Sequence, residues 1–373
     1  MNEEKATRYH RLKRRASVAS LVWHVALLTG LLATPASVAL RSAAQSVAGM
    51  IGSAEPSSSL VVATYVVFLV VLQEVGAFPL AFHSGFLLER RYGLSNERLS
   101  EWAMDQVKSL AIRLPVAVVA ASIVYAFIRQ MPLNWWLSAG AVFAVLIVVL
   151  TNLAPVLLLP LFYRVKPLER ESLRHRLLQL AERAGARVLG AYELGLAAKT
   201  KKANAALAGL GSTRRILVSD TMLAEYSDDE IEVVLAHELA HHVHGDIWKG
   251  ILFEITLILA GFWVSARALR LSLGPLGLSS LSDAAGIPVL LLVGGAVSLL
   301  MLPAAHALSR AYERSADRFA LELTRNPEAF VSAMKRLGAQ NLAEDDPSRL
   351  IQWLFHSHPP IRERISAAQA FKV

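Results

Sequence analysis

The segment from Ala236 to His242 contains the spacing His-Glu-x-x-His, formed by His237, Glu238 and His241. On a helix, residues four apart lie on the same face, so the two histidines can bind one metal ion. Glu238 then lies beside the ion, where its carboxylate can act as a general base toward a water molecule. Two imidazole ligands and a neighbouring glutamate are the arrangement of a zinc peptidase. The motif therefore predicts a metal-dependent hydrolase.

The residues before the motif indicate that it lies on a helix. Ser227 followed by Glu230 three residues later is typical of a capping box, and the acidic residues between them suit a helix N-terminus. Apolar residues then continue at helical spacing as far as the motif. The alternative is a surface helix that carries histidines by coincidence.

A catalytic zinc needs a third protein ligand and one open position. The candidate is Glu313, with Asp317 four residues later on the same helix face. One carboxylate can bind the ion while the other orients a ligand histidine. The alternative is a solvated helix in which the two carboxylates pair with Arg310 and Arg314.

A His-Glu-x-x-His motif followed far downstream by Glu-x-x-x-Asp resembles the M48 zinc metallopeptidases. Other segments are similar to the branch that contains the Ste24-type CAAX prenyl proteases, from about residue 85 onward: the loop Glu89–Ser95, the stretch Pro155–Leu168, the element Asn204–Gly209, and His358-Pro359-Pro360 with Arg364. One departure is the histidine-rich run 241–246, which is closer to the shorter bacterial M48 heat-shock proteases.

We interpret the metal site as one zinc ion per chain. The ligands are His237, His241 and Glu313, Glu238 is the general base, and Asp317 orients a ligand histidine.

The resemblance also implies residues that contact the substrate. Asn204 and Ala205 would belong to a sheet edge to which an extended peptide adds as a strand. For Asn204 the alternative is an ordinary turn asparagine. His358 or Arg364 would stabilise the oxyanion or bind the substrate C-terminus, and the alternative for both is a structural contact within the C-terminal tail.

The composition predicts a membrane protein. The chain is 54% hydrophobic, and its mean hydropathy of +0.42 is too high for an ordinary soluble enzyme. Six stretches are long enough to cross a bilayer: residues 17–40, 59–82, 110–129, 134–161, 250–269 and 286–308. The fourth contains Asn152, Pro155 and Pro160, which predict a kink or break near its cytosolic end. Glu74, inside the second, would line a water-filled cavity or form an interhelical hydrogen bond.

The distribution of Lys and Arg predicts the orientation of these spans. The N-terminus, the loop 83–109, the segment 164–249 and the tail after 309 are rich in basic residues. The loop 41–58 has only Arg41, and the loop 271–285 has none. Because basic loops stay on the cytosolic side, both termini and the zinc site are expected there, in a bacterial cytoplasmic membrane.

The expected fold is mainly α, a multi-pass membrane helical bundle or barrel with a small α+β cytosolic zinc-peptidase portion. The resemblance implies that the helices enclose a chamber. Residues 1–163 would form the transmembrane region with about four spans, and residues 164–373 the peptidase region with two more. In the soluble segment, periodicity predicts a helix over 169–184 and strands over 187–194, 204–208 and 215–219.

The predicted function is that of an integral-membrane zinc endopeptidase. Its partners would be membrane lipids and a peptide or protein substrate, and the resemblance implies a prenylated CAAX C-terminus. The net charge of +8 is explained by basic residues at the membrane edges, so no nucleic-acid partner is expected. The chain has no cysteine, which excludes disulfides and thiol chemistry. One alternative is a heat-shock-type quality-control protease. Another is a non-catalytic membrane scaffold, which the intact Glu238 and ligand set disfavour.

Overall fold

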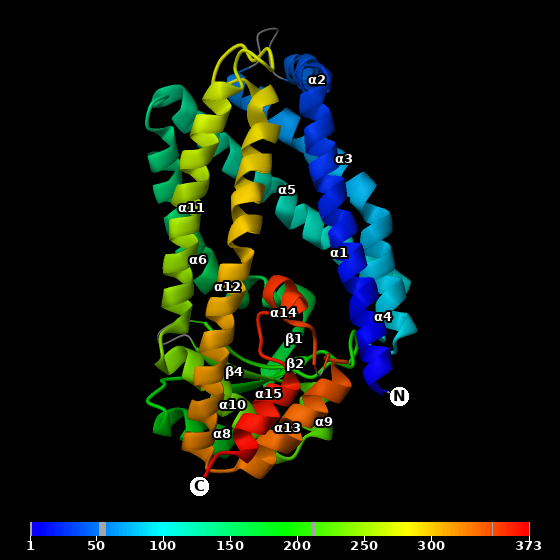
Figure 1. Cartoon of the computed structure of the whole chain (residues 1–373), viewed down its shortest axis with the longest axis vertical. Helices are drawn as coiled ribbons and strands as arrows, with labels where there is room; N and C mark the ends of the chain where they lie inside the picture. The colour runs from blue at the N-terminus through cyan, green and yellow to red at the C-terminus, as the bar shows by residue number, and fades with distance from the viewer. Residues whose placement is uncertain (1, 52–56, 210–213, 345, 373) are drawn as a thin grey trace.

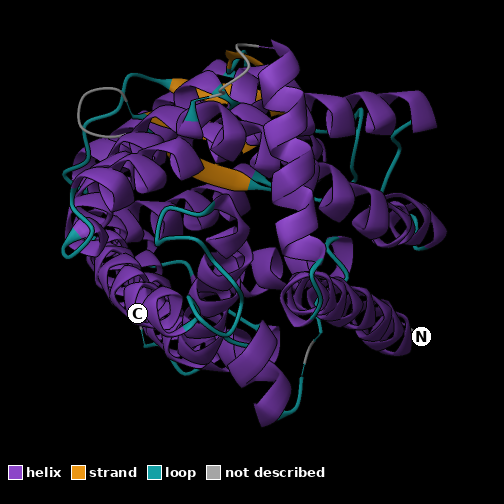
Figure 2. Ribbon diagram, turned by 90° about the horizontal axis from the view of Figure 1, so that it is seen from above, coloured by secondary structure: helices purple, strands orange, loops and turns teal. Residues whose placement is uncertain are grey.

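The apolar stretches form the long helices of the structure, a computed structural model that describes residues 2–51, 57–209, 214–344 and 346–372. Among these residues, five helices have the length and composition of a membrane span: Glu4–Ala33, Ser58–Arg91, Leu99–Gln130, Asp246–Leu271 and Ala284–Thr324. A further apolar helix is shorter over its described part, Trp135–Thr151. Both termini lie at the end of the molecule that holds the sheet (Figure 1), and helices make up most of the rest (Figure 2).

The first half of the chain forms the helices that precede the sheet. They are α1 (Asn2–Ala33), α2 (Ala36–Ile51), α3 (Ser58–Phe82), a π-helical turn (His83–Leu87), α4 (Leu88–Arg91), α5 (Leu99–Gln130), α6 (Trp135–Leu157) and α7 (Leu159–Phe162).

The second half forms the sheet, the helices that cover it and two further long helices. They are β1 (Arg164–Pro167), α8 (Glu171–Arg183), β2 (Ala191–Gly195), β3 (Ala205–Ala208), β4 (Arg215–Ser219), α9 (Asp220–Glu225), α10 (Asp228–Val243), α11 (Asp246–Leu271), a 3₁₀ turn (Ala284–Gly286), α12 (Ile287–Thr324), α13 (Pro327–Gln340), α14 (Arg349–Phe355) and α15 (Ile361–Gln369).

The first predicted span, residues 17–40, is wrong in its bounds. Helix α1 ends at Ala33 and a new helix begins at Ala36. Pro35 explains the break, because a proline disfavours helical backbone in the residue before it and cannot donate a main-chain hydrogen bond. In the fourth span, α6 ends at Leu157 and α7 begins at Leu159, so the chain breaks near Pro160 as predicted.

A cavity of about 510 Å³ lies among α3, α5, α6, α11 and α12. Its lining is mostly apolar, with Gln73 and Glu254 among the polar exceptions. Glu74 pairs with Arg113 of α5, at 2.9 Å between Oε1 and Nη1. Of the two roles predicted for Glu74, the structure therefore shows the interhelical contact.

The sheet has the strand order β1-β2-β4-β3, so β3 is an edge strand. Strands β2 and β4 are parallel, while β1 pairs with β2 and β3 with β4 in antiparallel register. The structure confirms the predicted helix as α8, and the strands predicted at 204–208 and 215–219 as β3 and β4. The strand predicted at 187–194 begins only at Ala191, and β1 was not predicted.

One hydrophobic core joins the sheet to the helices around it. Leu173 and Leu177 of α8, Ile216 of β4 and Leu235 of α10 are each fully buried in it. Because α10 and the edge strand β3 pack together, the helix that carries the two histidines is fixed beside that edge.

Candidate metal centre

Helix α10 begins with the capping box that the sequence predicts. Ser227 Oγ accepts a hydrogen bond from the Glu230 main-chain nitrogen, and Glu230 Oε2 accepts one from Ser227 N at 2.8 Å. Glu230 is buried and also accepts from Arg336 of α13 at 2.9 Å. The start of the helix is thus fixed both locally and by a neighbouring helix.

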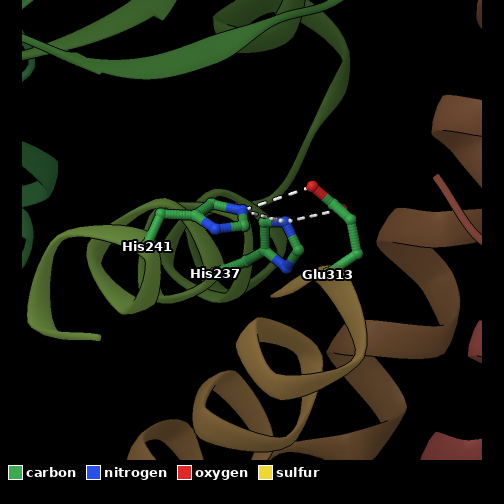
Figure 3. A group of neighbouring side chains, drawn as sticks. All are labelled: His237, His241 and Glu313. Atoms are coloured by element: carbon green, nitrogen blue, oxygen red, sulfur yellow. Dashed lines mark hydrogen bonds and ion pairs between the residues drawn. The ribbon is translucent and has the colours of Figure 1, made fainter. Parts of the chain in front are cut away.

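Helix α12 brings the third predicted ligand to the two histidines. Glu313 Oε2 lies 3.2 Å from His237 Nε2, and its Oε1 lies 3.3 Å from His241 Nε2. The two histidine Nε2 atoms are themselves 3.3 Å apart. Figure 3 shows the three side chains pointing toward one another from two helices. The structure therefore brings together all three residues predicted to bind the metal.

These distances fit a tetrahedral metal ion. With ligand distances of about 2.0–2.2 Å, tetrahedral geometry separates neighbouring ligand atoms by about 3.3–3.6 Å. The two histidine nitrogens are 3.3 Å apart, and each lies 3.2 to 3.3 Å from a different oxygen of Glu313. Two imidazole nitrogens and one carboxylate are also donor types that zinc binds in proteins.

Carboxylates outside the ligand set hold the two histidines in orientation. His237 Nδ1 lies 2.9 Å from Asp317 Oδ1, which matches the predicted role of Asp317. Arg364 donates to both oxygens of Asp317, at 2.5 and 2.8 Å, and its side chain is only 10% exposed. His241 Nδ1 lies 3.0 Å from Asp246 Oδ2, and Lys249 donates to the other oxygen at 2.9 Å.

Asp246 is a site residue that the sequence analysis missed. It is the first residue of α11, and it reaches back to His241 because Gly245 adopts a left-handed conformation with φ of 68°. A non-glycine residue would be strained there, so the chain could not turn as easily between the two helices. The indication available in the sequence was the glycine and acidic residue, Gly245 and Asp246, that end the histidine-rich run.

The charged groups of the site shift one another's pKa values. Burial lowers the pKa of His237, but the Asp317 and Glu313 carboxylates outweigh it and raise that pKa to about 9. Burial raises the pKa of Glu238, against the opposing effect of the two histidines. A carboxylate with a raised pKa is a stronger base, which suits the role predicted for Glu238.

Of the residues predicted to contact the substrate, His358 and Arg364 lie beside the ligand side chains, and Asn204 and Ala205 lie at the start of β3. His358 Nδ1 is 2.8 Å from Glu313 Oε2, and the His358 side chain is 63% exposed. Asn204 is exposed immediately before β3, and Ala205 is the first residue of that strand. Arg364 faces Asp317 and also approaches His237 Nδ1 at 3.4 Å.

Two family models together match almost the whole chain. The model described as Peptidase family M48 matches residues 167–372. The chain belongs to peptidase family M48. The model described as CAAX prenyl protease N-terminal, five membrane helices, matches residues 2–164.

Individual proteins agree with this assignment. An uncharacterized metalloprotease of Bacillus subtilis, YhfN, is 31% identical over 323 residues, which cover 86% of this chain and 76% of that protein. CAAX prenyl protease 1 of Saccharomyces cerevisiae is 26% identical over 311 residues, covering 78% of this chain and 68% of that protein. The crystal structure of S. mikatae Ste24p has a TM-score of 0.86 at 21% identity, covering 98% of this chain and 88% of that one.

The predicted fold class and enzyme class are thereby confirmed. The chain is a multi-pass integral-membrane metalloendopeptidase with a mainly helical fold and a small sheet. Because the similar proteins are a metalloprotease and CAAX prenyl proteases, neither the quality-control protease nor the non-catalytic scaffold is favoured.

Proposed function

We propose that the metal is one zinc ion per chain, held by His237, His241 and Glu313, and that Glu238 is the general base for peptide hydrolysis. The observation that carries this proposal is the convergence of three side chains: the two histidine Nε2 atoms are 3.3 Å apart, and each lies 3.2 to 3.3 Å from an oxygen of the Glu313 carboxylate. A bound zinc ion would activate water and polarise the scissile carbonyl.

Glu238 moves the proton in this mechanism. It accepts a proton from the attacking water as the new carbon–oxygen bond forms, and it donates that proton to the leaving amine as the carbon–nitrogen bond breaks. Asp317 and Asp246 accept hydrogen bonds from the two histidine Nδ1 atoms, so each Nε2 keeps its lone pair for the metal.

His358 and Arg364 have separate roles in this proposal. The exposed His358 imidazole lies beside Glu313, where it can donate a hydrogen bond to the oxyanion that forms on the scissile carbonyl. Arg364 is largely buried, and its guanidinium is occupied by Asp317. We therefore assign Arg364 to positioning Asp317, in place of the substrate contact expected from the sequence.

The edge strand β3 supports the proposed mode of substrate binding. The main-chain nitrogen of Asn204 donates to Ser219 Oγ at 3.0 Å, and its main-chain oxygen accepts from Ser219 N at 2.9 Å. In an antiparallel pair, consecutive residues direct their main-chain groups to opposite sides, so those of Ala205 face the open edge. An extended peptide can add there as a strand, with the Asn204 amide beside it.

The substrate class and the setting come from the chain's relatives and its charge pattern. The name of the yeast relative favours a protein with a prenylated CAAX C-terminus as substrate. The basic loops favour a bacterial cytoplasmic membrane with both termini and the zinc site in the cytosol, and contacts with anionic lipids. Residues 1–163 would then form the transmembrane region, and residues 164–373 the peptidase region with two further spans.

Two experiments test this proposal. Cleavage of a CAAX peptide with and without an isoprenyl group on its cysteine tests the substrate class. Equal kcat/KM for the two peptides would contradict recognition of the prenyl group and would leave the rest of the proposal intact.

Asn204→Ala should lower kcat/KM on the order of ten- to a hundredfold with unchanged metal content, as one lost buried hydrogen bond would. Ala205→Pro should lower it further, because proline disrupts the pairing edge. Unchanged kinetics in both variants would place substrate binding elsewhere.

A further inference from the structure

A buried carboxylate joins the N-terminal helix to the segment that leads into β3. Glu89 of α4 accepts a hydrogen bond from Tyr9 Oη at 2.5 Å and ion pairs from Lys13 and Lys202, the latter at 3.0 Å. Tyr9 is only 2% exposed and Glu89 only 9%. Three separate parts of the chain therefore meet at one carboxylate: α1, α4 and the segment before β3.

The turn after α4 binds the same segment through its main chain. Gly93 adopts φ of 74°, which reverses the chain after the helix. Leu94 O then accepts hydrogen bonds from Lys201 N at 3.0 Å and from Thr200 Oγ1 at 2.9 Å. Asn96 N donates to Lys199 O at 3.0 Å. Residues 94–96 therefore run alongside residues 199–201 like a short strand.

This attachment ends two residues before the substrate edge. Lys202 binds Glu89, Ala203 N donates to Asn341 Oδ1 at 3.1 Å, and Asn204 then begins to pair with Ser219. No residue between Lys202 and Ala205 is a glycine, so the path between them has little freedom. Lys202 is therefore one of the residues whose contacts fix the β3 edge, together with Ala203 and Asn204.

We propose that Glu89 and Lys202 are positioning residues that fix the β3 edge for the substrate. Among the described residues, the hydrogen bonds and ion pairs of these two side chains do not include a metal ligand, so their effect reaches the reaction through the alignment of the bound peptide. This inference rests on the proposed strand addition at Ala205. It assigns a role to the Glu89–Ser95 loop, which lies in the N-terminal half of the chain and far from the zinc motif in sequence.

Two lysines on the same carboxylate provide a matched comparison. Lys13→Met and Lys202→Met each remove one cation from Glu89, but only Lys202 lies on the segment that enters β3. We expect Lys202→Met to raise KM about three- to tenfold. This change corresponds to an interaction energy in the range found for residues in contact. Metal content and kcat should stay within about twofold of wild type. Lys13→Met should lower the thermal midpoint of unfolding about as much as Lys202→Met does, and it should leave KM unchanged.

A double variant tests whether the two residues act together. Glu89→Gln should raise KM as Lys202→Met does, and the combined variant should show no further increase. Equal KM in Lys13→Met and Lys202→Met, or wild-type KM in both Lys202→Met and Glu89→Gln, would overturn the inference. If Lys202→Met does not fold, the KM of Glu89→Gln can be compared with that of Lys13→Met instead.

Ala205→Pro separates this inference from the proposed function. If Ala205→Pro impairs cleavage and Lys202→Met does not, strand addition stands and only the positioning role fails. If Ala205→Pro is cleavage-competent with wild-type kinetics, the edge is not used and both claims fall.

Discussion

Asp317→Ala should weaken metal binding and destabilise the fold, and the two effects have different causes. Asp317 lies 2.9 Å from His237 Nδ1 and accepts two hydrogen bonds from Arg364. Loss of a carboxylate that orients a metal ligand costs about 10–100-fold in metal affinity, which is about 1.4–2.7 kcal/mol. The same change leaves the largely buried Arg364 guanidinium without its partner, at a cost of about 3–5 kcal/mol in unfolding free energy.

The double variant Asp317→Ala/Arg364→Met separates these effects. Replacing a buried ion pair with apolar side chains is often nearly neutral, so most of the unfolding free energy should return. Metal affinity should stay low, because His237 still lacks its partner. The assay is denaturation of the chelated protein in detergent, with metal titration against a competing chelator. Wild-type metal affinity in Asp317→Ala would refute the orienting role, and an equally unstable double variant would refute the unpaired-charge argument.

The remaining expectations concern the ligands, the pH dependence and the topology. Glu313→Ala should lose its metal on dialysis, by metal analysis; metal loss in Asp317→Ala with retention in Glu313→Ala would reverse the two roles. Asp246→Ala should weaken metal affinity by about 10–100-fold in a chelator titration. In the metal-free protein the pKa of His237 is raised from 6.5 to about 9, so its stabilising contribution is complete below pH 6.5 and is lost as the pH rises toward 9. Denaturation of the chelated protein across that range should show the decline, and His237→Ala should reduce it. Since the chain has no cysteine, a cysteine at Ser280 should react with an impermeant reagent in intact cells, and one at Ala198 should not; the opposite pattern would invert the topology.

Local sequence patterns predicted the features that depend on neighbouring residues. The capping box Ser227–Glu230, the helical face of His237 and His241, and β4 follow from spacings within one turn or one strand. Glu313 could be proposed because a helix places it and Asp317 on one face, and because the family motif has the same spacing.

Contacts between distant segments could not be read from those patterns. Arg364 reaches Asp317 across 47 residues of sequence, and Lys202 reaches Glu89 across 113. Strand β1 is only four residues long and pairs with β2, which begins 27 residues after β1 starts, so its own sequence carries little signal. The break at Pro35 was missed because the stretch 17–40 is apolar on both sides of it.

The central claim is that Glu238 is the general base of a metal-dependent peptide hydrolysis, and Glu238→Gln tests it most directly. Metal content and the rate of peptide cleavage should be measured on the same preparation as the wild type. Because the proposal places Glu238 outside the ligand set, we expect the metal content to stay near one ion per chain while hydrolysis is abolished. Full activity would contradict the mechanism, and loss of the metal would show that Glu238 belongs to the ligand set.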